Sequence, residues 1–252
     1  MAEKPLSGKR ALVTGASKGL GKAIAAALAE AGARLALVAR SPEPLKAAAE
    51  EIRAGGGEAD AFPADVAVEE QVRALADTIM ERFGGIDILV NNAGINVRKP
   101  VTELSFEEWK RVIDTNLTGV YLMCHYFVPQ MKGRGWGRIL NLTSIMSWVA
   151  LPGRTAYAAS KAGLLGFTRA LALELAEDGI TCVGISPGPF ATEMNRPLIE
   201  NPEVNAQFMA RVPLKRWGKV EEVGKLAVYL CTEEAGFITG TDILIDGGWT
   251  AQ

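Results

Sequence analysis

Tyr157 and Lys161 are the residues whose types and spacing point most directly to chemistry. They stand four residues apart, so on a helix they lie on the same face. A free tyrosine has a pKa of about 10, and a neighbouring ammonium group favours the phenolate and lowers that pKa. A phenol tuned in this way serves as a general acid and base near neutral pH. The pair predicts proton transfer to or from a substrate oxygen.

Ser144 and Asn116 are two further polar residues expected at this site. Ser144 follows an apolar run, and at the carboxyl end of a strand its hydroxyl can hydrogen-bond a substrate oxygen. Asn116 lies in the middle of a predicted helix, where helix propensity disfavours asparagine, so it indicates a functional role. His125, the only histidine, sits among apolar residues and is expected in the core or an interface. A Ser-His-Asp hydrolase would need His125 as its base and is not indicated.

Residues 14–21, TGASKGLG, form a glycine-rich loop between a predicted strand and a predicted helix. Gly15 permits a tight turn, Gly19 lets the backbone approach a pyrophosphate, and Gly21 permits close helix packing. The following helix presents free N–H groups and the positive end of its dipole to an anion. The loop therefore predicts a cradle for the phosphates of a dinucleotide, although its G-x-x-x-G-x-G spacing differs from the usual G-x-G-x-x-G.

The elements that position these residues alternate between short β-rich runs and longer helical ones. Strands are predicted at residues 10–14, 34–39, 58–62, 86–90, 138–143, 180–185 and 241–245. Helices are predicted at residues 20–31, 42–54, 68–83, 105–131, 155–177 and 220–230, with a capping box of Ser105 and Glu108. Continuously apolar strands joined by helices indicate a parallel sheet buried on both faces. We predict an α/β fold, a doubly wound seven-stranded parallel sheet in one domain over residues 1–252, with a small lid at residues 189–213.

Several motifs, taken together and in order, resemble the short-chain dehydrogenase/reductase family. They are T-G-x-x-x-G-x-G at 14–21, Asn91-Asn92-Ala93-Gly94, Asn116, Ser144, Y-x-x-x-K at 157–161, and Pro187-Gly188. They span essentially the whole chain. The stretches NNAGINVRKP, TEMNRPL and VPLKRWG look like the gluconate 5-dehydrogenase and 3-oxoacyl-ACP reductase branch.

The resemblance implies a Rossmann fold and hydride transfer between a nicotinamide and a carbonyl or secondary alcohol, with Tyr157 as the general acid and base. It also implies that Asn116 holds a water linking Lys161 to a proton relay, and that the chain forms a homotetramer. The catalytic residues would be Asn116, Ser144, Tyr157 and Lys161. The residues expected to bind the cofactor are Gly15, Ser17, Lys18, Gly19, Leu20, Gly21, Arg40, Ser41, Asp65, Val66, Asn92, Ala93, Gly94, Tyr157, Lys161, Pro187, Gly188, Phe190 and Thr192.

The residues after the second strand indicate which nicotinamide cofactor is preferred. Relatives that prefer NAD carry a carboxylate there for the ribose hydroxyls. This chain has Ala39 followed by Arg40, with Lys18 in the glycine loop. Two cations and no carboxylate suit a 2′-phosphate. We predict that NADP(H) is preferred over NAD(H).

The substrate pocket is expected to be built from residues 95–98, 145–153, 190 and 194–212, with Trp148 among its apolar groups. A sugar acid would need a cation for its carboxylate, which Arg98, Arg154 or Arg196 could supply. Reduction of 3-oxoacyl groups on acyl carrier protein and reduction of steroid or xenobiotic carbonyls stay open. A cofactor-binding sensor without turnover is disfavoured, because the chain keeps all four catalytic residues.

Composition excludes several other classes of protein. Lys plus Arg number 27 and Asp plus Glu 29, giving a formal net charge of −2 and no basic excess for nucleic-acid binding. No apolar run reaches the length of a membrane span, and the N-terminal stretch does not look like a secretory signal. Three scattered cysteines indicate neither a disulfide framework nor a metal site. We expect a soluble cytoplasmic protein acting on a small molecule, with no metal, nucleic-acid or membrane partner.

Overall fold

Seven parallel strands form the centre of the protein in a computed structural model, which describes residues 4–252. Their spatial order is β3-β2-β1-β4-β5-β6-β7. The strands are β1 (Arg10–Thr14), β2 (Arg34–Ala39), β3 (Glu58–Pro63), β4 (Ile88–Asn91), β5 (Gly137–Leu142), β6 (Ile180–Pro187) and β7 (Asp242–Ile245). Every neighbouring pair is parallel. The predicted seven-stranded parallel sheet is confirmed.

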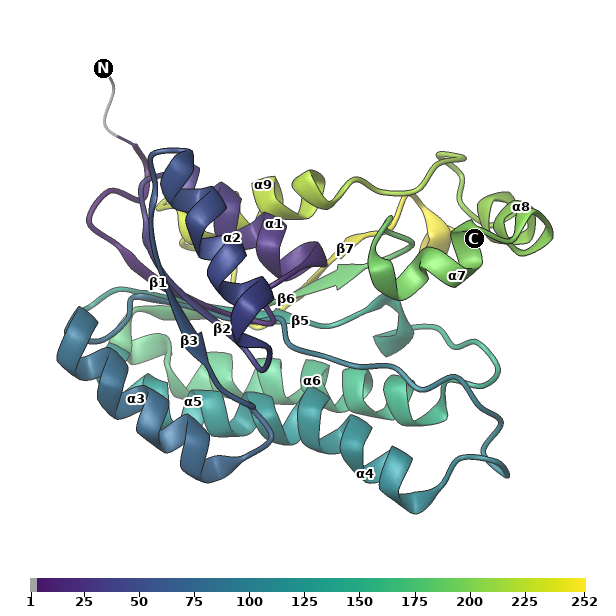
Figure 1. Ribbon diagram of the computed structural model, residues 1–252, viewed down its shortest axis with the longest axis horizontal. Helices are drawn as coiled ribbons and strands as arrows, with labels where there is room; N and C mark the ends of the chain where they lie inside the picture. Colours follow the sequence, from purple (N-terminus) through teal and green to yellow (C-terminus); the bar gives the residue numbers. More distant parts are fainter. Residues whose placement is uncertain (1–3) are drawn as a thin grey trace.

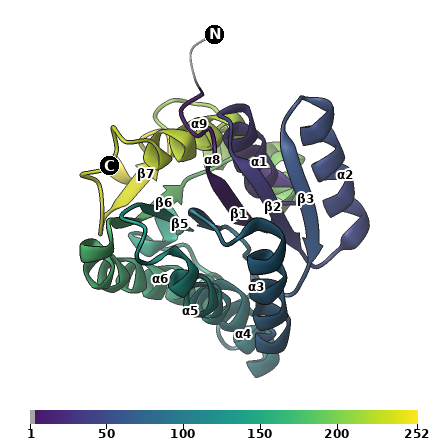
Figure 2. The same cartoon turned by 90° about the vertical axis from the view of Figure 1, so that its left-hand side faces the viewer.

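Helices cover both faces of this sheet (Figures 1 and 2). One face carries α1 (Gly19–Glu30), α2 (Pro42–Ala54) and α9 (Val220–Cys231). The other face carries α3 (Glu69–Phe83), α4 (Phe106–Ile113), α5 (Gly119–Met131) and α6 (Thr155–Glu174). Among residues 4–252 no helix is both long enough and apolar enough to cross a lipid bilayer.

Successive residues of a strand pack into different hydrophobic cores, one on each face of the sheet. In β1, Ala11 and Val13 join the core under α1, α2 and α9, whereas Leu12 joins the core under α3, α5 and α6. All three side chains are fully buried. Burial on both faces explains why the strands read as continuous apolar runs, with no alternation of apolar and polar residues.

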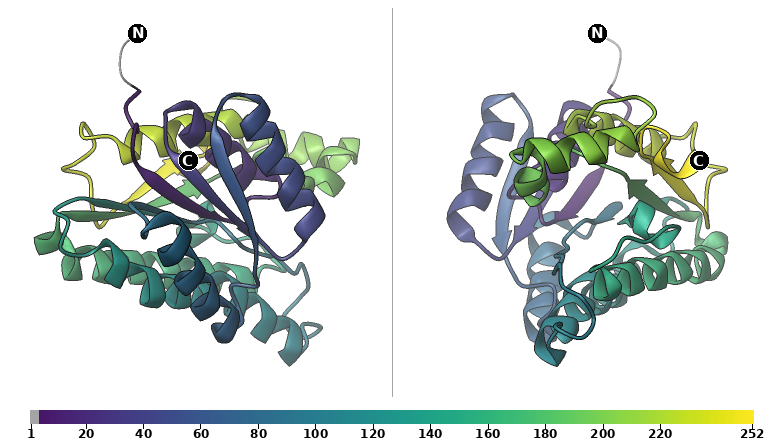
Figure 3. Two further views of the ribbon diagram at one scale, coloured as in Figure 1. Left: turned by 60° about the vertical axis from the view of Figure 1, so that its left-hand side comes forward. Right: turned by 90° about the vertical axis from the view of Figure 1, so that its right-hand side faces the viewer.

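The order of the strands reverses between β1 and β4. From β1 the chain moves outward to β3 and then crosses back through α3 to β4 on the other side of β1. Loops that leave these two strands diverge, and such switch points form crevices at the carboxyl edge of a parallel sheet. The segment predicted as a lid lies at this edge in short pieces. They are a 3₁₀ turn (Glu193–Asn195), α7 (Arg196–Ile199) and α8 (Pro202–Ala210), and they face the viewer in the right-hand view of Figure 3.

The predicted helix over residues 105–131 is the main departure from the sequence-based expectation. The capping box is present, since the Ser105 hydroxyl accepts from the Glu108 N–H at 3.1 Å and the Glu108 carboxylate accepts from the Ser105 N–H at 3.0 Å. However, a π-helical turn, Asp114–Thr118, separates α4 from α5. One wider turn changes the helical register, and such turns are frequent at functional sites. Asn116 lies in this turn.

Several other boundaries differ from the prediction by one to three residues. The strand β4 begins at Ile88, two residues later than expected. The helix α6 ends at Glu174, three residues before the expected end at Glu177. A short 3₁₀ turn follows and closes at Gly179, whose φ of 70° is left-handed. A Cβ on Gly179 would lie 2.4 Å from the carbonyl oxygen of Gly135, so only glycine fits this turn.

Candidate active site

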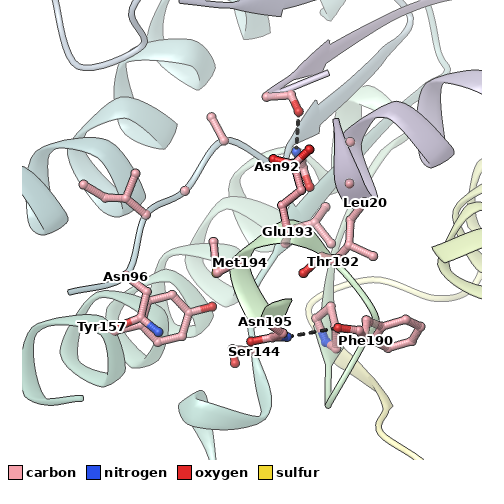
Figure 4. Close-up of a pocket in the computed structure, with 18 of the residues that line it drawn as sticks. Leu20, Asn92, Asn96, Ser144, Tyr157, Phe190, Thr192, Glu193, Met194 and Asn195 are labelled. Carbon is pink, nitrogen blue, oxygen red and sulfur yellow. Dashed lines mark hydrogen bonds between the residues drawn. The ribbon is translucent and has the colours of Figure 1, made fainter. Parts of the chain in front are cut away.

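A cavity of about 430 Å³ opens at the carboxyl edge of the sheet (Figure 4). Every predicted cofactor-binding residue lies on its wall, from Gly15 in the glycine loop to Thr192 beyond β6. Ser144, Tyr157 and Lys161 also line it. The fold therefore brings the glycine loop after β1 and the segment beyond β6 into one place.

The glycine loop is held tightly against the turn that follows β4. The side-chain amide of Asn92 donates to the carbonyl oxygens of Thr14 at 2.8 Å and Gly15 at 3.2 Å. A Cβ on Gly15 would lie 2.7 Å from the Asn92 Nδ2, and one on Gly21 would lie 2.4 Å from the Gly15 carbonyl oxygen. Side chains at these positions would force the loop away, so the glycines keep bare backbone facing the cavity. This is the cradle that a pyrophosphate requires.

Thr14 is a supporting residue that the sequence analysis did not single out. Its buried hydroxyl accepts hydrogen bonds from the N–H groups of Asn92 and Ala93, both at 3.0 Å. The end of β1 thus fixes the first residues after β4. The adjacent strands of the switch point are joined by side chains as well as by the backbone.

Asn116 lies behind the cavity wall and is fully buried. Its Oδ1 accepts from the Ile95 N–H at 2.8 Å, and its Nδ2 donates to the Ile95 carbonyl at 2.9 Å and to the Ser160 hydroxyl at 3.0 Å. The Ser160 hydroxyl in turn donates to the Tyr157 carbonyl at 2.7 Å. Asn116 therefore connects the loop after β4 to the first turns of α6.

Tyr157 projects its hydroxyl into the cavity (Figure 4). Burial raises the pKa of the Tyr157 phenol, while hydrogen bonding to Ser144 and the charges of Arg154 and Arg98 act to lower it. Among the protein's own groups burial prevails, so the net shift is opposite to the predicted one. The Ser144 hydroxyl accepts from the Met146 N–H at 3.1 Å, which leaves its own proton available to a substrate oxygen.

Lys161 lies one helical turn after Tyr157, and its ammonium nitrogen stands 5.7 Å from the centre of the tyrosine ring. The ammonium donates to the Leu142 carbonyl at 2.5 Å. Burial lowers the pKa of Lys161 to about 8, although the negative charge of Asp242 acts in the opposite direction. Lys161 therefore populates both its charged and its neutral form at mildly alkaline pH.

Arg154 and Arg98 are the cations on the substrate side of Tyr157. Burial and, to a smaller extent, the nearby charge of Arg98 lower the pKa of Arg154 to about 10. Within residues 4–252 no carboxylate lies within 4.0 Å of the Arg154 guanidinium. Arg98 donates to the Met194 carbonyl and to the Asn195 side chain, both at 3.1 Å, and so ties the lid segment to the loop after β4.

The two cations expected near a 2′-phosphate lie at the opposite end of the cavity. The Lys18 ammonium pairs with Glu193 at 2.5 Å, and the Arg40 guanidinium stands 3.8 Å from the Asp65 carboxylate. Their side chains are 66% and 60% exposed. Ion pairs this exposed contribute little to stability, so an incoming anion can displace the carboxylates.

Some predicted pocket residues lie elsewhere. Trp148 is 49% exposed and does not line the cavity, because its indole N–H turns to Asp242 at 2.7 Å. Arg196 also lies outside it and pairs with Glu200 at 2.6 Å. His125 is exposed on α5, with its ring 4.8 Å from that of Tyr126, so the core placement is wrong. In residues 4–252 no cluster of His, Cys, Asp or Glu could hold a metal ion.

Trp249 and Thr115 line the cavity but were not predicted from the sequence. Trp249, 8% exposed, comes from the segment after β7 and closes the substrate end together with Phe208 and Leu198 of the lid. Thr115 enters the wall from the π-helical turn. Neither residue belongs to a motif, and only the path of the chain brings them to the site.

Known proteins resemble this chain over nearly its whole length. A family model described as enoyl-(acyl carrier protein) reductase matches residues 15–250. A D-beta-hydroxybutyrate dehydrogenase of Rhizobium meliloti is 37% identical, over 97% of this chain and 99% of that protein. A 3-oxoacyl-(acyl-carrier-protein) reductase of Staphylococcus epidermidis is 39% identical, over 95% and 98%. The crystal structure of a gluconate 5-dehydrogenase from Burkholderia cenocepacia, in complex with NADP and tartrate, is 37% identical and superposes with a TM-score of 0.95, over 99% and 98%.

The sheet, the glycine cradle and these relatives define a nucleotide-binding type of α/β oxidoreductase. The chain belongs to the short-chain dehydrogenase/reductase family. Its residues Ser144, Tyr157 and Lys161 stand together on the cavity wall, as the motifs of that family predict.

Replacing Asn116 tests whether its hydrogen bonds to Ile95 stabilise the fold. In Asn116→Ala the Ile95 N–H and carbonyl lose their partners, which costs about 2 kcal/mol of unfolding free energy. Asn96→Ala is the matched control, because the buried Asn96 Oδ1 has no hydrogen-bond partner within residues 4–252. Urea unfolding measures both variants, and equal losses would contradict the assigned role of Asn116.

Proposed function

We propose that the protein is an NADP(H)-dependent oxidoreductase that interconverts a ketone and a secondary alcohol on a sugar acid. The observation that carries the substrate class is Arg154, a partly buried guanidinium beside Tyr157 with no carboxylate partner in residues 4–252. A buried cation without a counter-ion is costly. An anionic group on the substrate would supply the missing partner.

In this proposal the bound nicotinamide supplies or accepts the hydride. Tyr157 donates its proton to the substrate oxygen in reduction and takes it back in oxidation. Its raised pKa keeps the phenol protonated, as reduction requires. Ser144 donates a hydrogen bond to the same oxygen. Lys161 provides positive charge behind the phenol.

The proton relay proposed for Asn116 draws support from the space around Gly94. A Cβ on Gly94 would lie 3.3 Å from the Asn116 Oδ1 and 3.6 Å from the Lys161 ammonium nitrogen. The missing side chain thus leaves the gap between these two atoms open. A water held there would connect Lys161 to the hydrogen bonds of Asn116.

The nucleotide end supports the preference for NADP(H). Gly15, Gly19 and Gly21 leave room for the pyrophosphate, and Lys18 and Arg40 stand beyond them with no carboxylate at position 39. Three solved relatives carry bound NADP.

The substrate end supports a hydroxy acid. Arg154 provides charge, and the lid contributes both polar and apolar groups to the wall, among them Asn195 and Leu198. The gluconate 5-dehydrogenase that resembles this chain binds tartrate, itself a hydroxy acid. A 3-oxoacyl thioester is the second candidate, because curated relatives are named reductases of that substrate class.

The assembly, the domain count and the location of the protein also remain proposals. A homotetramer stays a prediction, supported by Phe237 and Leu173, which are exposed to 103% and 81% on the surface of the single chain. One domain over residues 1–252 is supported by the single sheet that gathers all seven strands. A cytoplasmic location stays a prediction from the sequence.

Substitution of the phenol tests the mechanism. In Tyr157→Phe, turnover with NADPH is expected to fall by about 10²- to 10⁴-fold, the usual contribution of a general acid, while NADPH binding followed by fluorescence is retained. Tyr229→Phe removes an exposed phenol on α9 and should leave turnover unchanged. Undiminished turnover in Tyr157→Phe would end the assignment.

Steady-state kinetics with both cofactors test the preference. The wild-type protein should give a higher kcat/KM with NADPH than with NADH. Arg40→Ser should lower kcat/KM for NADPH by about 10- to 100-fold, the value of a charge-assisted hydrogen bond, and leave the value for NADH nearly unchanged. Lys46→Ser, which removes an exposed cation from α2, serves as the control.

A panel of carbonyl compounds tests the substrate class. We expect 5-ketogluconate to be reduced faster than a neutral ketose or a 3-oxoacyl thioester. Arg154→Met keeps the aliphatic part of the side chain and should raise the KM for 5-ketogluconate by about 10-fold or more, without changing the KM of the neutral ketose. Arg196→Met is the control, since its guanidinium pairs with Glu200 on the surface. A preference for the thioester would favour the second candidate.

A further inference from the structure

Asp242, the first residue of β7, is a half-buried carboxylate that accepts from three side chains. The Thr143 hydroxyl lies 2.6 Å from its Oδ1. The Ser186 hydroxyl donates to its Oδ2 at 2.5 Å, and the Trp148 indole N–H donates to the same oxygen at 2.7 Å. The Thr143 hydroxyl is also 2.7 Å from the Ile185 carbonyl, so its one proton serves either acceptor.

The sheet makes room for this carboxylate. Asp242 pairs with Gly184 of β6, and a Cβ on Gly184 would lie 2.2 Å from the Asp242 Oδ1. Any larger residue at position 184 would push the carboxylate away from Thr143 and Ser186. A glycine within a strand weakens it, and close approach of Asp242 explains the glycine here.

Each of the three donors stands beside part of the proposed active site. Thr143 directly precedes Ser144, and Ser186 directly precedes the Pro187-Gly188 turn on the cavity wall. Trp148 ends the 3₁₀ turn, residues 145–147, that follows Ser144. Asp242 therefore joins the end of β5, the end of β6 and the loop that carries Ser144.

Lys161 is linked to the same place. Leu142, whose carbonyl accepts from the Lys161 ammonium, directly precedes Thr143. The Ser147 hydroxyl donates to the Lys161 carbonyl at 3.0 Å, so both ends of the lysine residue contact residues 142–147. Tyr157 on the same helix lies beside the Lys161 ammonium, and the negative charge of Asp242 acts to raise the pKa of Lys161 against the larger lowering by burial.

We propose that Asp242 is a positioning residue that sets the place of Ser144 and of the turn after β6 by accepting these hydrogen bonds. The negative charge of Asp242 also favours the ammonium form of Lys161. This inference rests on the proposed function of Ser144, Tyr157 and Lys161.

Two substitutions separate position from charge. In Asp242→Asn the amide oxygen still accepts from Trp148, and the amide N–H can donate to a hydroxyl, so mainly the charge is lost. Asp242→Ala removes both. Trp148→Phe removes one donor and keeps the charge. Glu233→Gln is the control, because it removes an exposed carboxylate from the surface.

The first measurement needs neither nucleotide nor substrate. NMR titration of the lysine side chains should show a lower pKa for Lys161 in Asp242→Asn and in Asp242→Ala than in the wild type, and an unchanged pKa in Trp148→Phe and Glu233→Gln. An unchanged Lys161 pKa in Asp242→Asn would overturn the electrostatic part of the proposal.

The second measurement is the pH dependence of ketone reduction with NADPH. In Asp242→Ala, kcat should fall by about 10- to 100-fold, as expected when supporting residues shift a catalytic group by about 1 Å. The alkaline limb should move to lower pH in Asp242→Asn and Asp242→Ala, since Lys161 loses its proton earlier. In Trp148→Phe kcat should fall less and the limb should stay in place.

Failure of the inference differs from failure of the proposed function. If kcat of Asp242→Ala stays within twofold of the wild type while Tyr157→Phe is inactive, Asp242 does not position the site. If Tyr157→Phe keeps its turnover, the proposed mechanism fails, whatever Asp242 does. Should Asp242→Ala fail to fold, Ser186→Ala combined with Asp242→Asn replaces it: kcat losses that simply multiply would overturn the proposal.

Discussion

The contact between the end of β1 and the turn after β4 is the constraint on which the rest of the site depends. Strand order reverses at this point, so the loops from the two strands must part above the sheet while their first residues stay in contact. Thr14 and Asn92 hold that contact through four hydrogen bonds. A side chain at Gly15 or Gly21 would occupy the space that the Asn92 amide needs. The glycines are therefore fixed by the neighbouring strand as much as by any nucleotide.

Burial sets the chemistry of the catalytic end. Tyr157 and Lys161 lose solvent together, and burial works against the charged form of each. The phenol is held protonated while the pKa of the ammonium falls to about 8, so both groups are less charged than in water. The surrounding charges, from Arg154 and Arg98 on one side and Asp242 on the other, partly oppose these shifts. The site is thus a balance between desolvation and a few charges contributed by distant elements.

The bounds of several strands and helices were predictable because the apolar runs in the sequence begin and end abruptly. The bounds of β1, β2 and α2 agree with the prediction to the residue, since apolar runs there end at glycine, proline or charged residues. The π-helical turn was not predictable, because residues 114–118, DTNLT, contain neither a glycine nor a proline to mark a break in the helix. The placement of Trp148 and Arg154 could not be predicted from the sequence. The two residues are six positions apart and both were expected at the pocket, but only Arg154 lines it.

The near-zero net charge of the chain conceals an ordered distribution of cations along the cavity. At the mouth, Lys18 and Arg40 are exposed and already have carboxylate neighbours, so an arriving anion exchanges one weak pair for another. Deeper inside, Arg154 and Lys161 are shielded from water and have no salt bridge among residues 4–252, so a negative group there gains more from each contact. An anion that binds Lys18 or Arg40 must therefore displace a carboxylate. An anion that binds beside Arg154 or Lys161 instead supplies the counter-ion that these cations lack. This difference favours ligands that carry negative charge at both ends of the cavity over ligands that carry it at only one.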